Sequence, residues 1–533
     1  MLVALMLAMP MNAFQYIEYN ELDDTVQAQT TGGLVQGLRM DDYAVFYGIP
    51  FAAPPVGDAR WQPPTDPKSW QPNVLDARYP QYGCPQNCML PPGTCPTNTS
   101  EDCLYLNVFV PLTALPVDGE SNRPVMAFLP GGRFEQGAAS SVLYNAGTMV
   151  NSSNAIVVTI NYRLGVLGFL MTDDFTGNYG FLDQRQALQW IQNNIAYFGG
   201  NSSRVTLCGQ SAGATSIAAH ITSPLSFGLF QQAISESNPF TLDLKTRTVA
   251  KQNSMHFAKA VGCPTATPAC LLAVDADAVI QGQIKAQQEV DPLIPLAAFL
   301  PWTPTVDEVD ILDQPITLIE QGKFLDIPMI VGTVKEEALL FIYQASAKNI
   351  TEEEYAGVLA LLFYEKAVDI AAGYPPVHSD NRPVMSVLGT NFIFVCPNRN
   401  MTRYLNRVEP VFTYQFQHVL SFDAWGPDYP YCVGHVCHGS ELPFIFNSAS
   451  LGGYTFDADE QVLAYAMNNY WMNFVANGNP NIGLSVPTVW PNYDTNTDQS
   501  MIFQAPTPFV QANVLEPQCN SLDQLVGYND PYR

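Results

Sequence analysis

The chain has 533 residues, of which 47% are hydrophobic and 14% are charged. That balance supplies enough apolar surface for a large folded interior, and it excludes an intrinsically disordered chain. The formal net charge of −26 repels nucleic acid and anionic membranes, so binding to either through charge is excluded. The simplest interpretation is an acidic surface that keeps the protein in solution.

The N-terminal segment is short and apolar. Residues 1–11 read MLVALMLAMPM, which is too short to span a bilayer and is similar to the apolar part of a signal peptide without its basic start. We predict a signal peptide over residues 1–13 and a secreted, extracellular protein. The alternative is a disordered N-terminal tail on a cytosolic protein. No other stretch reaches the length of a membrane span, so we expect none.

Eleven cysteines and five glycosylation sequons favour the extracellular interpretation. Several cysteines lie in short loops rich in Pro, Gly and Asn, where a local disulfide is sterically easy. None has the paired CxxC spacing of a zinc site, so we expect no metal, and we expect no cofactor either. The sequons, which predict N-glycosylation, are at Asn98, Asn151, Asn201, Asn349 and Asn400.

Short β-branched runs alternate with helical patterns, and no flexible linker divides the chain. This order predicts an α/β fold, with a mainly parallel sheet that is flanked by helices on both faces. One helix is expected to run to about Phe198, with Asp183 as its N-terminal cap. We expect strands at Val125–Leu129, Ile156–Asn161, Val205–Cys208, Met329–Gly332 and Val411–Phe416.

The third expected strand runs into Gly209-Gln210-Ser211-Ala212-Gly213, and a helical stretch follows. This is the G-x-S-x-G pattern of a nucleophile elbow, in which the tight turn requires small neighbours on both sides of the serine. We predict that Ser211 is a nucleophile. The N–H of Ala212, at the start of the helix, is expected to help bind the oxyanion. The alternative is a tight turn with a structural role only.

Further motifs occur in a fixed order: GIPFAAPPVG over 48–57, SEDCLYLN over 100–107, NYR over 161–163 and NYG over 178–180. Together with the elbow, they resemble the type-B carboxylesterase and cholinesterase-like family of the α/β-hydrolase fold. The resemblance extends from about Gly32 to Leu522. It implies a single α/β-hydrolase catalytic domain, which we place at residues 30–525, built on a large, mostly parallel central sheet.

The resemblance also implies the two partners of the serine, in the order serine, acid, histidine. The segment GTVKEE, which ends at Glu337, resembles the acid motif of the family and makes Glu337 the acid. Its neighbour Glu336 is the rival and is expected to be solvated. The segment GHVCHGSELP, over 434–443, resembles the histidine loop and makes His438 the general base. His435 is the rival for this role.

A segment that resembles the family's glycine-rich oxyanion loop follows the first expected strand. It reads Pro130-Gly131-Gly132-Arg133-Phe134, where the family pattern is His, three glycines and an aromatic residue. The main-chain N–H groups of Gly132 and Arg133 are expected to join Ala212 in the oxyanion hole, provided that Arg133 adopts the backbone angles of a small residue. If it does not, one lost donor lowers the rate by roughly 10²–10³. The Arg133 side chain would lie near the site and meet an acidic substrate.

The resemblance implies disulfides Cys84–Cys103, Cys263–Cys270 and Cys396–Cys519. Short loop lengths suggest two more, Cys88–Cys95 and Cys432–Cys437, of which the second would fix the loop that carries His438. Cys208 is left as a buried free thiol.

These features predict a serine hydrolase whose partner is a small-molecule ester, with an acyl-enzyme on Ser211. We favour short- to medium-chain carboxylic esters. Choline esters are not expected, because the Cys84–Cys103 loop has no aromatic residue and position 210 is Gln. The alternatives are a lipase of the same family and a non-catalytic binding or adhesion protein.

Overall fold

The structure is a computed structural model, and it describes residues 24–114, 122–289, 296, 299–407 and 409–528. The signal peptide expected over residues 1–13 lies outside the described residues. Within them, no helix combines the length and the hydropathy that crossing a bilayer requires.

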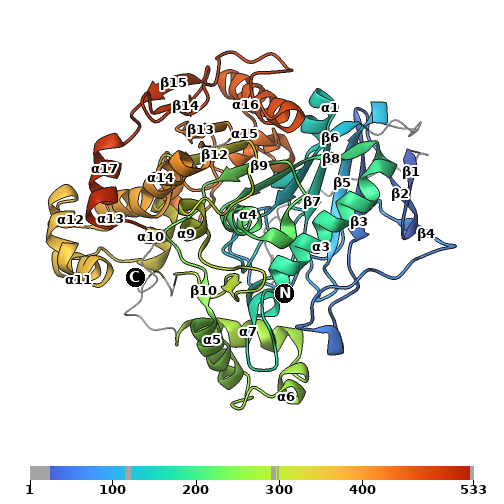
Figure 1. Ribbon diagram of the computed structural model, residues 1–533, viewed down its shortest axis with the longest axis horizontal. Helices are drawn as coiled ribbons and strands as arrows, with labels where there is room; N and C mark the ends of the chain where they lie inside the picture. Colours follow the sequence, from blue (N-terminus) through green and yellow to red (C-terminus); the bar gives the residue numbers. More distant parts are fainter. Residues whose placement is uncertain (1–23, 115–121, 290–295, 297–298, 408, 529–533) are drawn as a thin grey trace, which may run out of the picture.

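A large sheet runs through the described part of the chain (Figure 1). Its strands are β1 (Thr25–Thr30), β2 (Gly33–Arg39), β3 (Tyr43–Pro50), β4 (Val74–Asp76), β5 (Tyr105–Pro111), β6 (Arg123–Leu129), β7 (Ile156–Ile160), β8 (Gly200–Gln210), β9 (Gln232–Glu236), β12 (Met329–Val334), β13 (Val411–Phe416), β14 (Gln499–Phe503) and β15 (Phe509–Ala512). The five strands expected from the sequence are confirmed as β6, β7, β8, β12 and β13.

The strand order is β1-β2-β3-β5-β7-β6-β8-β9-β12-β13-β14-β15, with β4 paired to β2. The central strands from β7 to β14 in this order are parallel to one another. Antiparallel strands complete the sheet at both ends. A second, small sheet pairs β10 (Lys245–Thr246) with β11 (Thr305–Val306). The expectation of a mostly parallel central sheet is therefore confirmed.

Helices cover both faces of the large sheet (Figure 1). They are α1 (Gly147–Ser153), α2 (Gly165–Phe169), α3 (Tyr179–Asn194), α4 (Ala212–Thr222), α5 (Arg247–Ala260), α6 (Pro268–Leu272), α7 (Ala276–Gln287), α9 (Pro315–Glu320), α10 (Leu339–Ala345), α11 (Glu352–Phe363), α12 (Ala367–Gly373), α13 (Arg382–Gly389), α14 (Cys396–Leu405), α15 (Leu442–Ile445), α16 (Ala458–Asn477) and α17 (Glu516–Leu525).

Alternation along β6 explains the two helical layers, because successive side chains of a strand point to opposite faces. Val125 and Ala127 belong to a core cluster that includes residues of α3, α4 and α9. Met126 and Phe128 belong to a second cluster, which includes residues of α1, α15 and α16. The strand is apolar on both faces because both faces are covered.

The parallel strands bring four distant segments to one edge of the sheet. Ser211 follows the end of β8 directly, and Glu337 lies three residues after β12. His438 lies in the long connection after β13, and Gly132 lies in the segment after β6. Because the carboxyl ends of parallel strands meet at one edge, these segments converge there.

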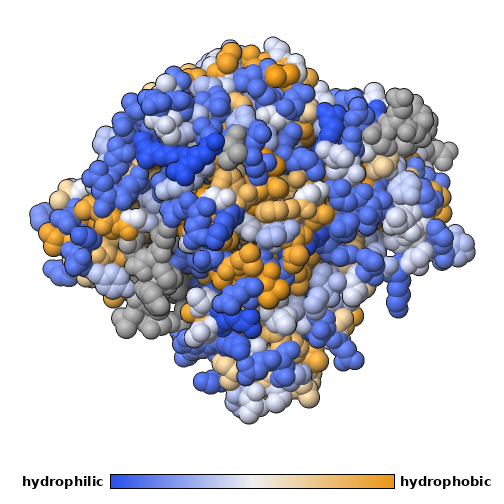
Figure 2. All heavy atoms as spheres, in the orientation of Figure 1, coloured by the Kyte–Doolittle hydropathy of each residue, from blue (hydrophilic) through white to orange (hydrophobic). Residues whose placement is uncertain are grey.

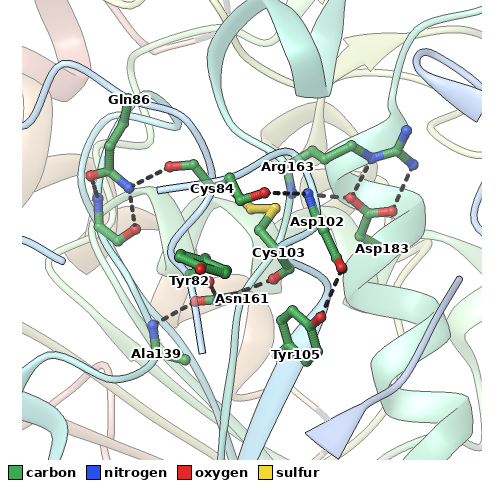
Figure 3. The surroundings of a disulfide bond; sticks show 12 residues. Tyr82, Cys84, Gln86, Asp102, Cys103, Tyr105, Ala139, Asn161, Arg163 and Asp183 are labelled. Carbon is green, nitrogen blue, oxygen red and sulfur yellow. Dashed lines mark hydrogen bonds and ion pairs between the residues drawn. A yellow bond between two sulfur atoms is a disulfide. The ribbon is translucent and has the colours of Figure 1, made fainter. Parts of the chain in front are cut away.

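Helix α3 begins earlier than its expected cap. Asn178 is its N-cap residue and the helix starts at Tyr179, so the expectation that Asp183 caps it was wrong. Asp183 is buried within the helix, where its carboxylate accepts hydrogen bonds from Arg163 Nε at 2.8 Å, Nη2 at 2.7 Å and the main-chain N at 3.0 Å (Figure 3). A buried guanidinium requires such a counter-charge, and this requirement outweighs the capping preference of aspartate.

The Cys84–Cys103 disulfide closes a loop beside the end of β7 (Figure 3). The side chain of Asn161, which follows β7, donates to the Cys103 carbonyl at 3.1 Å and accepts from the N–H of Ala139 at 2.8 Å. Gln86, within the disulfide loop, accepts from Gly137 N at 2.8 Å and donates to Gly137 O at 3.0 Å. These bonds attach the disulfide loop to the glycine-rich segment after β6.

The disulfide partners are the five pairs expected from the sequence. They are Cys84–Cys103, Cys88–Cys95, Cys263–Cys270, Cys396–Cys519 and Cys432–Cys437. Cys208 is a buried free thiol, and burial raises its pKa well above the usual range.

Glu236 ends β9 and is completely buried beneath the carboxyl edge of the sheet. The indole N–H of Trp471 donates to its Oε1 at 2.7 Å, and the thiol of Cys208 lies 3.6 Å from the same oxygen. Burial outweighs these two bonds and raises the pKa of Glu236 from 4.5 to about 8. The shift favours the protonated, neutral form of this carboxyl group in the folded protein.

Hydrophilic residues cover most of the face shown in Figure 2, and hydrophobic residues gather near its centre. Exposed apolar side chains of the described surface include Leu225, Phe227 and Val309. Such a mixture is ordinary for a folded protein, because polar residues are too few to cover the surface alone.

We expect Asp183→Ala to lower the free energy of unfolding by about 3–5 kcal/mol, because the guanidinium of Arg163 would remain buried without a counter-charge. Denaturation in urea, followed by tryptophan fluorescence, measures this change. The control is Asp76→Ala, which breaks a pair whose side chains are 51% and 35% exposed and should cost less than about 1 kcal/mol. Equal losses in the two variants would contradict the account of Asp183.

We expect Glu236→Gln to change how stability depends on pH. The folded protein keeps the Glu236 proton up to about pH 8, whereas the unfolded chain releases it near 4.5, so stability falls as the pH rises through this window. Glutamine cannot ionise, so the variant should lose less stability than the parent between about pH 5 and pH 9. Denaturation at several pH values tests this, with exposed Glu353→Gln as the control. Parallel curves for Glu236→Gln and the parent would refute it.

Candidate active site

Ser211 occupies a strained turn between β8 and α4, with φ 57° and ψ −119°. Residues with a side chain rarely adopt a positive φ, and such strain is typical of functional sites. The glycines of the motif are required by space. A Cβ atom on Gly213 would lie 2.1 Å from the carbonyl oxygen of Leu129, and one on Gly209 would lie 2.7 Å from the main chain of Gly213. The side chain of Ser211 faces the pocket described below.

Glu337 and His438 form a buried pair. The ring Nδ1 of His438 lies 2.5 Å from Oε2 of Glu337, and the other carboxylate oxygen accepts from the N–H of Val334 at 2.8 Å. The imidazole is packed by the rings of Phe341 and Phe394, whose centroids are 5.1 and 5.2 Å away. The carboxylate fixes the tautomer with the proton on Nδ1, so Nε2 is left as an acceptor.

The amide of Gln210 is hydrogen-bonded to the second ring nitrogen of His438, with 3.1 Å between the two Nε2 atoms. In the described residues, no hydrogen bond joins the Ser211 hydroxyl to the imidazole, although both side chains line one pocket. The amide N–H donates to the neutral ring in this arrangement. In the sequence, Gln210 counted only as evidence against choline esters, and this contact was not predicted; the place of Gln210 beside Ser211 was the one available signal.

Glu336 and His435, the rivals of Glu337 and His438 for the roles of acid and base, contact each other. Oε1 of Glu336 lies 2.8 Å from the ring Nδ1 of His435, and its Oε2 accepts from the N–H of Val436 at 2.7 Å. Glu336 is 31% exposed, and it is also a partner of the histidine loop, a contact that the expectation of a solvated neighbour did not include. Neither residue lines the pocket in the described part of the chain.

The sequence left open which backbone angles Arg133 adopts in the glycine-rich segment after β6. Arg133 has φ 61°, and Gly132 before it has φ 120°. The carbonyl of Gly132 accepts from the N–H groups of Glu135 at 3.0 Å and Gln136 at 3.1 Å, which closes a tight turn. The N–H groups of Gly132 and Arg133 donate to no other group within the described residues, and both residues line the pocket with Ser211.

The Arg133 side chain is held at the wall of the pocket. Its Nη2 donates to the carbonyl of Phe299 at 2.6 Å, and its guanidinium carbon lies 5.1 Å from the centroid of the Phe299 ring. The carboxylate of Glu135 lies 3.6 Å away. Burial raises the pKa of Glu135 to about 7, an effect that the charge of Arg133 opposes. Arg133 is the only Lys, Arg, Asp or Glu among the described lining residues.

The pocket has a volume of about 160 Å³ and a mainly apolar wall. This is close to the volume of a cavity that admits one benzene molecule. Aromatic side chains from the segment after β13 form much of the wall, and no motif in that segment marks it as part of the pocket. The lining aromatic residues are Tyr144, Phe341, Phe422, Trp425, Tyr429 and Tyr454.

The described side chains of the pocket offer hydroxyl, imidazole, amide and guanidinium groups. Across the described residues, no group of three or more His, Cys, Asp or Glu side chains is placed to hold a metal ion. The arrangement therefore provides the parts of nucleophilic acyl transfer: a hydroxyl, an imidazole oriented by a carboxylate, and free main-chain donors.

A model of the carboxylesterase family matches residues 23–522. The cAMP-regulated D2 protein of Dictyostelium discoideum is 42% identical over 95% of this chain and 93% of its own. The acylcarnitine hydrolase of Mus musculus is 34% identical over 87% and 84% of the two chains. The structure of a PNB esterase superposes with a TM-score of 0.79 at 30% identity, and it covers 93% of this chain and 99% of its own. The chain therefore belongs to the carboxylesterase family, and it is a serine carboxylic-ester hydrolase of the α/β-hydrolase fold.

Proposed function

We propose that the protein hydrolyses small, short- to medium-chain carboxylic esters through an acyl-enzyme on Ser211, with His438 as general base and Glu337 as the acid that orients it. The observation that carries the proposal is the convergence of the strained Ser211 turn and the buried Glu337–His438 pair on one pocket. A hydroxyl, an imidazole and a carboxylate that orients the imidazole are the three groups that a triad requires.

Acylation begins when the substrate enters and the imidazole exchanges its bond with Gln210 for one with the Ser211 hydroxyl. The Ser211 oxygen attacks the acyl carbon while Nε2 of His438 takes its proton. Glu337 keeps its charge and stabilises the imidazolium that forms. The imidazolium then gives the proton to the alcohol oxygen as the carbon–oxygen bond breaks, and the acyl-enzyme remains.

Deacylation repeats these steps with water as the nucleophile. In both halves of the reaction the negative charge on the acyl oxygen is held by the main-chain N–H groups of Gly132, Arg133 and Ala212. This role is supported by the N–H groups of Gly132 and Arg133, which are left without partners in the described part of the chain, in a tight turn where both residues have positive φ. The Ala212 N–H adds the positive end of the α4 dipole.

The size and polarity of the pocket support small neutral or weakly polar esters. A volume of about 160 Å³ accommodates a group of roughly benzene size, and the apolar wall stabilises it by burial. The described wall carries no carboxylate that would bind a cationic alcohol such as choline. The aromatic side chains alone are a weaker attraction for a cation than aromatic side chains combined with a negative charge.

The same proposal includes secretion and N-glycosylation. The disulfides support an oxidising compartment, because cytosolic thiols are kept reduced. The sequon asparagines Asn98, Asn151 and Asn349 are exposed, whereas Asn201 and Asn400 are partly buried. The exposed three are the sites that a glycosyl transferase and its bulky product reach with least hindrance.

We expect Ser211→Ala to lower kcat for p-nitrophenyl esters by about 10⁶, because the nucleophile of a triad that acts as a unit is lost. A fluorophosphonate should label the parent at Ser211 and leave the variant unlabelled. The control is Ser450→Ala, which removes an exposed hydroxyl and should leave both readouts unchanged.

A series of p-nitrophenyl esters of increasing acyl length tests the substrate class. The proposal requires kcat/KM to be highest for the short and medium acyl chains. Activity that rises sharply at an emulsion interface would instead support a lipase. Absence of both turnover and fluorophosphonate labelling in the parent would support a non-catalytic binding protein.

We expect the protein, when secreted from a eukaryotic host, to carry N-linked glycans at Asn98, Asn151 and Asn349. Enzymatic release of the glycans converts each modified asparagine to aspartate, and peptide mass mapping identifies the sites. The partly buried Asn201 provides the comparison and should be modified to a smaller extent. An unmodified asparagine at all three exposed sequons would contradict this part of the proposal.

A further inference from the structure

The segment after β12 carries two adjacent carboxylates, and each one holds a different part of the histidine loop. Glu337 points inward, is fully buried and binds the His438 ring. Glu336 binds a different part of the loop, and its side chain is 31% exposed. The chain turns directly after β12, and the two adjacent carboxylates contact the loop at different points.

Glu336 makes three contacts with two successive residues of the loop, His435 and Val436. Its N–H donates to the Val436 carbonyl at 3.1 Å, and its Oε2 accepts from the Val436 N–H at 2.7 Å. Its Oε1 lies 2.8 Å from the ring of His435. The main chain also forms an isolated parallel bridge between Glu336 and Cys437, the residue that precedes His438.

The bond to the Val436 N–H is the strongest of the side-chain contacts. A carboxylate that accepts from a main-chain N–H forms a charge-assisted bond, which is roughly twice as strong as a neutral one. The His435 contact is weaker, because its side chain is 47% exposed and water screens the pair. The carboxylate therefore acts mainly on the loop backbone, two residues before His438.

The loop is also held by apolar packing. Cys432 and Cys437 are buried in one cluster with Leu339 of α10, and the rings of Tyr343 and Tyr431 stack with their centroids 5.1 Å apart. The Cys432–Cys437 disulfide closes a short turn and joins the loop to itself. Glu336 adds a polar attachment between the loop and the segment that also carries Glu337. The two carboxylates together hold the loop backbone and the ring in one relative position.

We propose that Glu336 is a positioning residue, whose carboxylate fixes the main chain of the histidine loop so that the His438 ring stays in reach of Ser211. This inference rests on the proposed role of His438 as the base. Glu336 does not line the pocket in the described residues, so it acts through the loop and touches no substrate. Misplacement of a catalytic group by about 1 Å can cost about 10²-fold in rate, which is why such a contact matters.

The test compares three variants by steady-state kinetics on a p-nitrophenyl ester, with kcat expressed per active site titrated by a fluorophosphonate. Glu336→Ala should lower kcat by about 10- to 100-fold and leave KM within about twofold, because the base moves while the pocket does not. Glu336→Gln should recover most of this loss, since its amide oxygen still accepts from the Val436 N–H. Lys335→Ala, which removes the exposed neighbouring side chain, is the matched control.

Because kcat is divided by the concentration of titrated active sites, unfolded molecules do not lower it. Poor folding of Glu336→Ala therefore does not by itself produce the expected result. The inference is overturned if kcat of Glu336→Ala stays within about twofold of the control, or if KM alone changes. It is also overturned if Glu336→Gln is as slow as Glu336→Ala. A separate variant, His438→Gln, tests the underlying assignment: full activity there would sink the proposed function itself, whatever Glu336 does.

Discussion

Main-chain atoms crowd so closely around Ser211 that two positions beside it have no room for a side chain. The chain leaves β8, turns at a positive φ and enters α4 within a few residues, while the carbonyl of Leu129 from the neighbouring strand presses against Gly213. This close packing sets the position of the hydroxyl and of the first N–H of α4 together. The remaining parts of the site are arranged around a point that the backbone itself defines.

The sheet brings those parts together, and buried polar groups hold them in place. Parallel strands deliver the oxyanion segment, the acid and the histidine loop to one edge, but the connections after the strands are long and irregular. Main-chain N–H groups after the oxyanion segment donate to the side chains of Asn161 and Gln86, and these bonds attach the segment to the first disulfide loop. The buried Arg163–Asp183 pair fixes the end of β7 against α3. These side-chain hydrogen bonds hold the segments beyond the strand ends, where the main-chain hydrogen bonds of the sheet stop.

The sequence predicts well what depends on local pattern and order. The central strands and the elbow follow from residue patterns, two of the disulfides follow from short loops, and the other three follow from the family resemblance. It predicts poorly what depends on distance across the fold. Aspartate is a common helix cap, yet the carboxylate of Asp183 binds a buried arginine 20 residues earlier instead. The place of Gln210 beside Ser211 puts it in the site but does not identify its partner, a histidine 228 positions away. No local pattern indicates that the segment after β13 supplies much of the aromatic wall.

The different partners of Glu336 and Glu337 also constrain how this segment can change in evolution. Glu337 lies three residues after β12, so deleting or inserting one residue between them would move its carboxylate away from the imidazole. Substitutions at the exposed Lys335 leave that spacing intact. The length of the segment should therefore be far more restricted among related genes than the identity of its outward side chains, and gaps in an alignment should fall elsewhere.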